Sequence, residues 1–181
     1  MKQEYIITVF SENNIGLLSR ITIIFTRRKI NIDSLTVSES AISGVFKFTI
    51  VINETADRVQ KVVGQLEKVV DVLKVFANTN DEMIFQEIAL YKVSTEFLFE
   101  SDKVEKIVRN SGARILEITR DYVVVEKTGH TDETQRLFEE LNSFYGVTQF
   151  IRSGRVAITK STIERLSVFL KERDAMLEQI D

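Results

Sequence analysis

The chain has 181 residues and a formal net charge of −3, with 44% hydrophobic and 28% charged residues, a composition typical of globular proteins. It contains no cysteine and a single histidine, His130, which excludes disulfide frameworks, thiol nucleophiles and multi-histidine metal sites. Its acidic balance argues against nucleic-acid binding, and no apolar run is as long as a membrane span.

The first half of the chain alternates strand and helix patterns. Residues 3–10 predict a strand, and Gly16 opens an amphipathic helix that ends at the basic cluster Arg27-Arg28-Lys29. Strands are predicted at 31–38, 44–52 and 71–77, and Thr55 can cap a second helix. The apolar stripes of the two helices are Leu17, Leu18, Ile21, Ile24 and Phe25, then Val59, Val62, Val63, Leu66 and Val70. The predicted order is βαββαβ.

The same order of elements repeats after a short linker at residues 79–83. Strands are predicted at 84–95, 113–119, 122–127 and 147–152, with one helix capped by Ser101 and another at 132–145. The second helix is expected to bury Leu137, Phe138, Leu141 and Phe144. Each unit predicts a ferredoxin-like module, with both helices on one face of an antiparallel sheet. We therefore expect an α+β chain with domains at residues 1–78 and 84–181.

Residues 161–180 follow the second module and carry a helix pattern of their own. Ile163, Leu166, Leu170, Leu177 and Ile180 are at heptad a/d spacing, and Arg173 interrupts the seam. This pattern fits a helix that packs on its own domain, and it also fits a contact with a partner helix or a second copy of the chain.

The sequence shows no constellation of catalytic groups. His130 falls in a turn before a predicted helix and is expected to be a surface residue, and the seven glycines form no phosphate-binding pattern. RNA-recognition modules share the βαββαβ order but need exposed aromatic residues on the third strand. Here Phe46 and Phe48 share the face that meets the helices, whereas Lys47 lies on the opposite face, which we expect to be open. The chain is therefore predicted not to be an enzyme.

The first strand-to-helix turn, Ser11–Gly16, has features of a small-ligand site. A helix N-terminus offers free N–H groups to a carboxylate, and Gly16 would let a ligand approach the backbone. Asn13 can both donate and accept hydrogen bonds, as a zwitterionic amino acid requires, and Asn31 could face the same region. Ordinary capping of the helix by Asn13 or Asn14 is the alternative on spacing alone.

Several segments, in the same order along the chain, resemble the regulatory (small) subunit of acetolactate synthase, also called acetohydroxyacid synthase. The segments are Asn13-Asn14-Ile15-Gly16-Leu17-Leu18-Ser19-Arg20, Arg28-Lys29-Ile30-Asn31-Ile32-Asp33-Ser34-Leu35-Thr36-Val37, Val70-Asp71-Val72-Leu73-Lys74-Val75, Glu87-Ile88-Ala89-Leu90-Tyr91-Lys92-Val93 and Ile151-Arg152-Ser153-Gly154. The resemblance spans about residues 4–160 and implies an N-terminal ACT domain followed by a related C-terminal domain.

The resemblance also implies a function for the chain as an auxiliary subunit. Such subunits form homodimers, activate a catalytic large subunit and confer feedback inhibition by a branched-chain amino acid, usually valine. Thiamine diphosphate, magnesium and FAD would belong to the catalytic subunit only. The effector would lie between two ACT domains, held by Asn13 and Gly16 of one chain and Asn31 of the other.

Two positions near this site depart from some relatives, and one alternative function stays open. Ile15 replaces a small polar residue and Ile30 an aromatic one, so both could tune the choice of effector. The alternative is a stand-alone ACT-type amino-acid sensor that regulates another enzyme or a transcription response. The first residues lack the apolar core of a signal peptide, so we expect a cytoplasmic protein.

Overall fold

The structure is a computed structural model that describes residues 1–95, 103–162, 166, 168, 170 and 171. The chain divides into two compact units, one made of Met1–Ile84 with Ala157–Asp181 and the other of Phe85–Val156. Both units combine an antiparallel sheet with two helices, which confirms the predicted α+β class and the repeated βαββαβ order.

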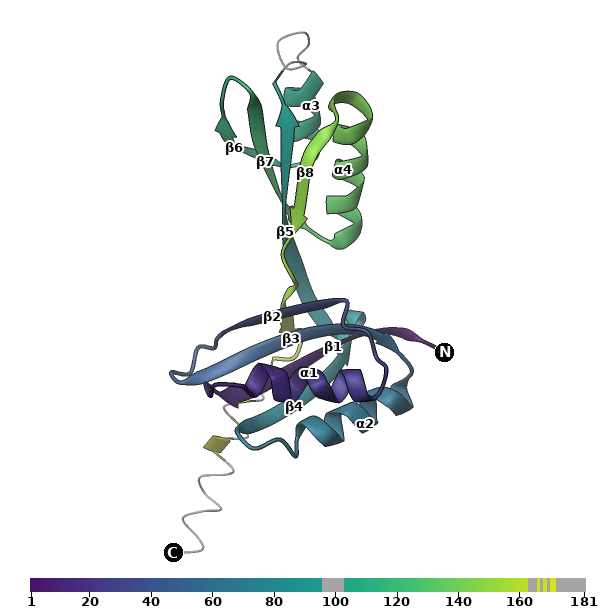
Figure 1. Ribbon diagram of the computed structural model, residues 1–181, viewed down its shortest axis with the longest axis vertical. Helices are drawn as coiled ribbons and strands as arrows, with labels where there is room; N and C mark the ends of the chain where they lie inside the picture. Colours follow the sequence, from purple (N-terminus) through teal and green to yellow (C-terminus); the bar gives the residue numbers. More distant parts are fainter. Residues whose placement is uncertain (96–102, 163–165, 167, 169, 172–181) are drawn as a thin grey trace, which may run out of the picture. The chain divides into compact units, whose positions relative to one another are not determined.

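The first unit follows the predicted order of elements. Its elements are β1 (Gln3–Glu12), α1 (Leu17–Arg27), β2 (Ser34–Glu39), β3 (Val45–Glu54), α2 (Ala56–Leu66) and β4 (Val72–Thr79). The strand order is β2-β3-β1-β4, so β2 and β4 are the two edges of the sheet. Figure 1 shows α1 and α2 on the same side of this sheet, as the right-handed crossovers require.

The core of this unit lies between the sheet and its two helices. Alternate residues of β1 and β3, including Ile7, Val9, Phe48, Ile50 and Ile52, pack against the buried residues Leu17, Ile21, Phe25, Val59, Val62 and Leu66. Two predicted core positions are wrong. Leu18 is exposed because it lies on the outer side of α1, and Val70 is exposed because α2 ends at Leu66.

The opposite face of the first sheet is covered, although the strand pattern predicts an open face. Val45, Thr49 and Val51 of β3 are buried there. Lys47 donates a hydrogen bond to the backbone carbonyl of Ala157, and residues that follow Ala157 lie on the same face. The structure thus groups the described residues after Ala157 with the first unit, whereas the sequence pattern places them in the second domain. The helix predicted at 161–180 falls mostly outside the described residues.

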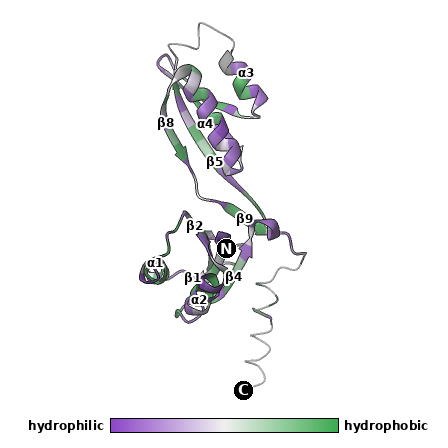
Figure 2. Ribbon diagram, turned by 90° about the vertical axis from the view of Figure 1, so that its right-hand side faces the viewer, coloured by the Kyte–Doolittle hydropathy of each residue, from purple (hydrophilic) through white to green (hydrophobic). Residues whose placement is uncertain are grey.

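The second unit is built on a long central strand. After the short 3-10 helix η1 (Asn80–Glu82) come β5 (Met83–Ser94), α3 (Lys103–Asn110), β6 (Arg114–Ile118), β7 (Tyr122–Gly129), α4 (Thr131–Tyr145) and β8 (Val147–Arg152). The last strand, β9 (Val156–Thr159), lies almost wholly in the part of the chain that groups with the first unit. The strand order is β6-β7-β5-β8, and β9, which the sequence pattern does not predict, pairs with β5. Figure 2 shows α3 and α4 on one side of this sheet.

The core of the second unit lies between its sheet and these two helices. It is formed by Ala89, Tyr91, Val93, Ile107, Val108, Val123, Val125, Leu137 and Leu141. Phe144 is exposed, contrary to expectation, although it shares a helix face with Leu141, because it lies in the last turn of α4, which ends at Tyr145. The predicted cap Ser101 lies outside the described residues.

Candidate functional site

The turn between β1 and α1 leaves the first helix without a side-chain cap. The residue at its N-cap is Gly16, whose φ of +83° lies in the left-handed region that glycine adopts without strain. Asn13 and Asn14 are exposed, and neither side chain forms a hydrogen bond within the described part of the chain. Capping by these asparagines is therefore not observed. In the first helical turn, the amide groups of Leu18 and Ser19 remain available to an anionic ligand group.

The backbone of this turn is held from two directions. The Glu12 N–H donates to the Asp71 carbonyl at 2.9 Å, and the Leu17 N–H donates to the Asn14 carbonyl at 3.2 Å. No heavy atom beyond the chain neighbours lies within 4 Å of the position that a Cβ on Gly16 would take. The turn is therefore ordered by backbone contacts and is open above Gly16.

Asn31 does not meet Asn13 within one chain. The two residues flank opposite ends of α1, which has 11 residues. A helix of that length is about 16 Å long. Asn31 is exposed, and its amide nitrogen donates to the Asp33 carboxylate at 2.9 Å. The two asparagines can therefore contact one small ligand only if they come from two chains.

The two isoleucines differ sharply in exposure. Ile15 is fully exposed in the turn, with a relative accessible surface of 105%, whereas Ile30 is 6% exposed and belongs to the core of the first unit. Lys29, with a φ of +53°, turns the chain before Ile30, whose N–H donates to the Phe25 carbonyl at 3.0 Å. The Ile30 side chain thus packs inward, and only Ile15 presents an aliphatic surface beside the turn.

Further apolar side chains are exposed on α1 and β2, and the sequence patterns do not predict that these side chains form an exposed surface. Leu18 and Ile23 of α1 and Val37 of the edge strand β2 are each at least 41% exposed. An edge strand presents unpaired backbone groups, so β2 and α1 together offer both hydrogen bonds and apolar area to a second molecule. The sequence hints at this surface only through Leu18 and Ile23, because these two residues make α1 apolar beyond the face that packs on the sheet.

The described residues contain no catalytic arrangement around their buried acids. Glu87 is buried in the second unit, where its carboxylate accepts hydrogen bonds from Thr134 at 2.7 Å and Thr131 at 3.2 Å. Arg152 lies 3.5 Å from the same carboxylate. A carboxylate with three partners is a structural acid rather than a free base. His130 is exposed at the N-cap of α4, and its ring contacts Phe85 at 4.7 Å between centroids.

The part of the chain that the structure describes also contains no group of three or more His, Cys, Asp or Glu residues placed to hold a metal ion. None of its helices combines the length and the apolar character that crossing a membrane requires.

Comparisons with known proteins identify both units. Residues 7–74 match the "AHAS small subunit-like ACT domain", and residues 86–161 match the family described as "Small subunit of acetolactate synthase". The chain is 34% identical to the acetolactate synthase small subunit of Bacillus subtilis over 163 residues, which cover 90% of this chain and 94% of that protein. It is 31% identical to the probable acetolactate synthase small subunit of Archaeoglobus fulgidus, over 87% of this chain and 97% of the relative.

The fold is also that of a solved relative. The crystal structure of the acetolactate synthase small subunit from Thermotoga maritima superposes with a TM-score of 0.80 at 23% identity, over 89% of this chain and 99% of that one. The order of elements, the ACT domain and the full-length relatives agree with the resemblance in the sequence. The chain therefore belongs to the family of acetolactate synthase small (regulatory) subunits.

Proposed function

We propose that this chain binds and activates the thiamine-diphosphate-dependent catalytic subunit of acetolactate synthase and confers feedback inhibition by a branched-chain amino acid, with valine as the effector. This activity would control valine, leucine and isoleucine biosynthesis in the cytoplasm. The observation that carries the proposal is the open, uncapped turn at Asn13–Gly16 within the matched ACT domain. A carboxylate at that helix N-terminus is favoured by the helix dipole and the free amide groups.

The proposed effector site is shared between two chains. The effector carboxylate would bind the amides that follow Gly16, with Asn13 beside it, and the effector ammonium would bind the Asn31 side-chain oxygen of the second chain. Asn31 supports this role because its amide nitrogen is already bonded to Asp33, so that the amide oxygen is the group left to accept a hydrogen bond from a ligand. The exposed Ile15 would contact the aliphatic side chain of the effector. Ile30, buried in the core, would act only through the position of Asn31.

The homodimer that this site needs would form through β2 and α1. Pairing of two β2 edges would join two sheets, and the exposed side chains of Leu18, Ile23 and Val37 would be buried between the chains. A two-fold axis through such an interface makes two equivalent effector sites, each with Asn13 from one chain and Asn31 from the other. The catalytic partner would carry thiamine diphosphate, magnesium and FAD.

Feedback inhibition requires that the effector distinguishes two states of the complex. A ligand shifts an equilibrium only by the difference between its affinities for the two states. A site divided between two chains provides this difference, because a change in the relative position of the chains changes the distance between Asn13 and Asn31. The catalytic subunit would sense this change through its contacts with the small-subunit dimer.

The deciding experiment measures acetolactate formation by the catalytic subunit of the same organism. We expect the rate to rise when the chain is added, and the added activity to fall in valine. The Asn13→Ala variant should activate equally and resist valine. A catalytic subunit that neither co-purifies with the chain nor responds to it would contradict the proposal and favour the stand-alone sensor.

A further inference from the structure

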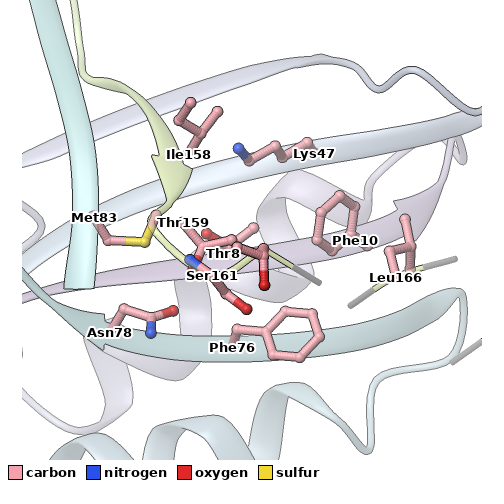
Figure 3. A pocket seen from close by; sticks show the side chains of 11 residues that line it. Thr8, Phe10, Lys47, Phe76, Asn78, Met83, Ile158, Thr159, Ser161 and Leu166 are labelled. Carbon is pink, nitrogen blue, oxygen red and sulfur yellow. Dashed lines mark hydrogen bonds between the residues drawn. The ribbon is translucent and has the colours of Figure 1, made fainter. Parts of the chain in front are cut away.

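A cavity lies on the face of the first sheet that is opposite to the helices. Its volume is about 310 Å³, within the range of small-ligand pockets. Thr8 and Phe10 of β1, Lys47 of β3, and Phe76 and Asn78 of β4 form its floor. Met83 and residues of the C-terminal segment, including Ile158, Ser161 and Leu166, line the rest of the cavity (Figure 3). All the lining residues that the structure describes belong to the first unit.

The cavity combines one cation with an apolar end. Figure 3 shows the amine end of Lys47 directed toward Ile158, while the rings of Phe10 and Phe76 lie on the other side of the cavity. These two rings contact edge to face, with 6.2 Å between centroids. The hydroxyl groups of Thr8 and Ser161 lie between the two ends. A ligand that fits this wall is amphipathic, with a polar head at Lys47 and a tail at the rings.

The charge of Lys47 identifies the head group of the ligand. Lys47 forms no ion pair among the described residues, and none of the described residues that line the cavity is acidic. Its ammonium has three N–H donors, of which the Ala157 carbonyl accepts one. Burial lowers the pKa of Lys47, because the charged form loses water without gaining a counter-charge. A bound carboxylate would supply that counter-charge.

We propose that this cavity is a second ligand site, distinct from the effector turn, that binds a small aliphatic monocarboxylate. The carboxylate binds the Lys47 ammonium and the aliphatic tail lies against Phe10, Phe76 and Leu166. The volume limits the tail to a short chain, because the site is at the lower end of the range for ligand pockets. This site is complete within one chain, unlike the turn at Asn13, so it does not depend on dimer formation.

The test uses the full chain and a pair of probes that differ only in charge, 4-methylpentanoate and 4-methylpentanamide. The chain has three methionines, Met1, Met83 and Met176, and of the two that the structure describes, Met1 and Met83, Met83 lines the cavity. Isotope-labelled methionine methyl groups therefore give a resonance that reports on the cavity, and a Met83→Leu variant assigns it. We expect the carboxylate to shift the Met83 resonance with saturation at neutral pH, and the amide to bind at least about tenfold more weakly.

Two matched variants test whether the Lys47 ammonium is the group that binds the carboxylate of the probe. Lys47→Gln should weaken binding of 4-methylpentanoate at least about tenfold, while Lys68→Gln, an exposed position outside the cavity, should leave it unchanged. Asn13→Ala should also leave it unchanged.

Three outcomes would overturn the proposal. They are equal binding of the two probes to the wild-type chain, binding by Lys47→Gln at the wild-type affinity, and loss of binding in Asn13→Ala, which would place the probe in the effector turn. The comparison of the two probes needs no variant, so it decides the proposal even if Lys47→Gln does not fold.

Discussion

Arg20 of α1 forms an ion pair with Asp71, with 2.6 Å between the guanidinium and the carboxylate. Arg20 also donates to the Val70 carbonyl at 3.4 Å, and the Asp71 carbonyl accepts the Glu12 N–H at 2.9 Å. The loop before β4 is thus bonded to both the strand that enters the Asn13–Gly16 turn and the helix that leaves it. Asp71 adopts a φ of +78°, a conformation that aspartate and asparagine tolerate better than other side chains.

Two substitutions at Asp71 should separate the contribution of its charge to stability from the contribution of its backbone conformation. We expect Asp71→Asn to lower the free energy of unfolding by less than about 1 kcal/mol, because the ion pair is partly exposed. Asp71→Ala should cost about 1 kcal/mol more, because alanine is strained at positive φ. Both variants should bind valine more weakly, since the turn loses one support. Denaturant unfolding and calorimetric titration of valine measure the two effects, and equal stability of the two variants would contradict the strain argument.

Mixed dimers should show whether the effector site is shared between chains. Asn13→Ala and Asn31→Ala should each weaken valine binding by at least about tenfold, because each removes a hydrogen bond to a charged group. A heterodimer of the two variants contains one site with both substitutions and one site with neither. The heterodimer should therefore have half of the wild-type number of high-affinity sites, and an equal mixture with random pairing should have about one quarter. A mixture without any high-affinity site would place both asparagines in the same chain's site.

Val37 tests the edge strand as the dimer interface. Val37→Lys places a charge on β2, which disfavours pairing of two edges, so the dimer should dissociate and valine binding should fall with it. Val37→Thr keeps the branched shape without the charge and should remain dimeric. Sedimentation measures the oligomeric state and circular dichroism checks the fold. If the Val37→Lys variant remains a dimer, the dimer interface does not include the β2 edge.

The strand pattern predicts the layers of the first unit because side chains alternate with a period of two. That period places Phe46 and Phe48 on the helix side of the sheet and Lys47 on the other, as the structure has them. It could not reveal that the second face is covered. The apolar pattern after Ala157 shows that the segment has a face to bury, but the pattern is the same whichever sheet it covers.

The candidate site could be predicted only in part, because some of its features depend on the folded backbone and not on the spacing of residue types. The spacing around Gly16 indicates an open helix N-terminus, and the structure has an uncapped helix with Gly16 at positive φ. The burial of Ile30 depends on the positive φ of Lys29, which is not a glycine and carries no signal in the sequence. The separation of Asn13 from Asn31 by the length of α1 is a property of the folded chain, and periodicity alone does not show that a second chain must complete the site.

Glu54 should make the stability of the chain depend on acid pH. Its buried carboxylate accepts hydrogen bonds from Lys2 at 3.0 Å, Arg58 at 2.7 Å and the Thr55 N–H at 3.1 Å. The hydrogen bond from Lys2 is the largest cause that lowers the pKa of Glu54, and burial opposes it. A lowered folded-state pKa stabilises the fold above the unfolded value of about 4.3 and loses that effect as the pH falls through the folded value.

The expected result is a wild-type unfolding midpoint that decreases below about pH 4.3. Glu54→Gln should be less stable at neutral pH, with a flatter dependence in the acid range, and Lys2→Met should reproduce part of the change. Thermal unfolding over a series of acid pH values measures it. Parallel curves for wild type and Glu54→Gln would remove Glu54 from the acid response.

A substitution at Gly16 should separate inhibition by valine from activation of the catalytic subunit. A side chain at this position meets open space, so Gly16→Asp should fold, at a cost of about 1 kcal/mol or less for the positive φ. Its carboxylate would lie at the N-terminus of α1, where it occupies the amides that the effector carboxylate needs and repels that carboxylate. Valine inhibition should therefore be lost.

Gly16→Asn is the matched control, because asparagine has nearly the same shape and the same tolerance of positive φ but carries no charge. It should retain weakened inhibition, whereas Gly16→Asp retains none. Activation of the catalytic subunit should survive in both variants, since a complex that cannot bind the effector keeps its active state. Acetolactate formation with and without valine measures both properties. If Gly16→Asp activates and is still inhibited at the wild-type valine concentration, the effector carboxylate does not bind at this helix N-terminus.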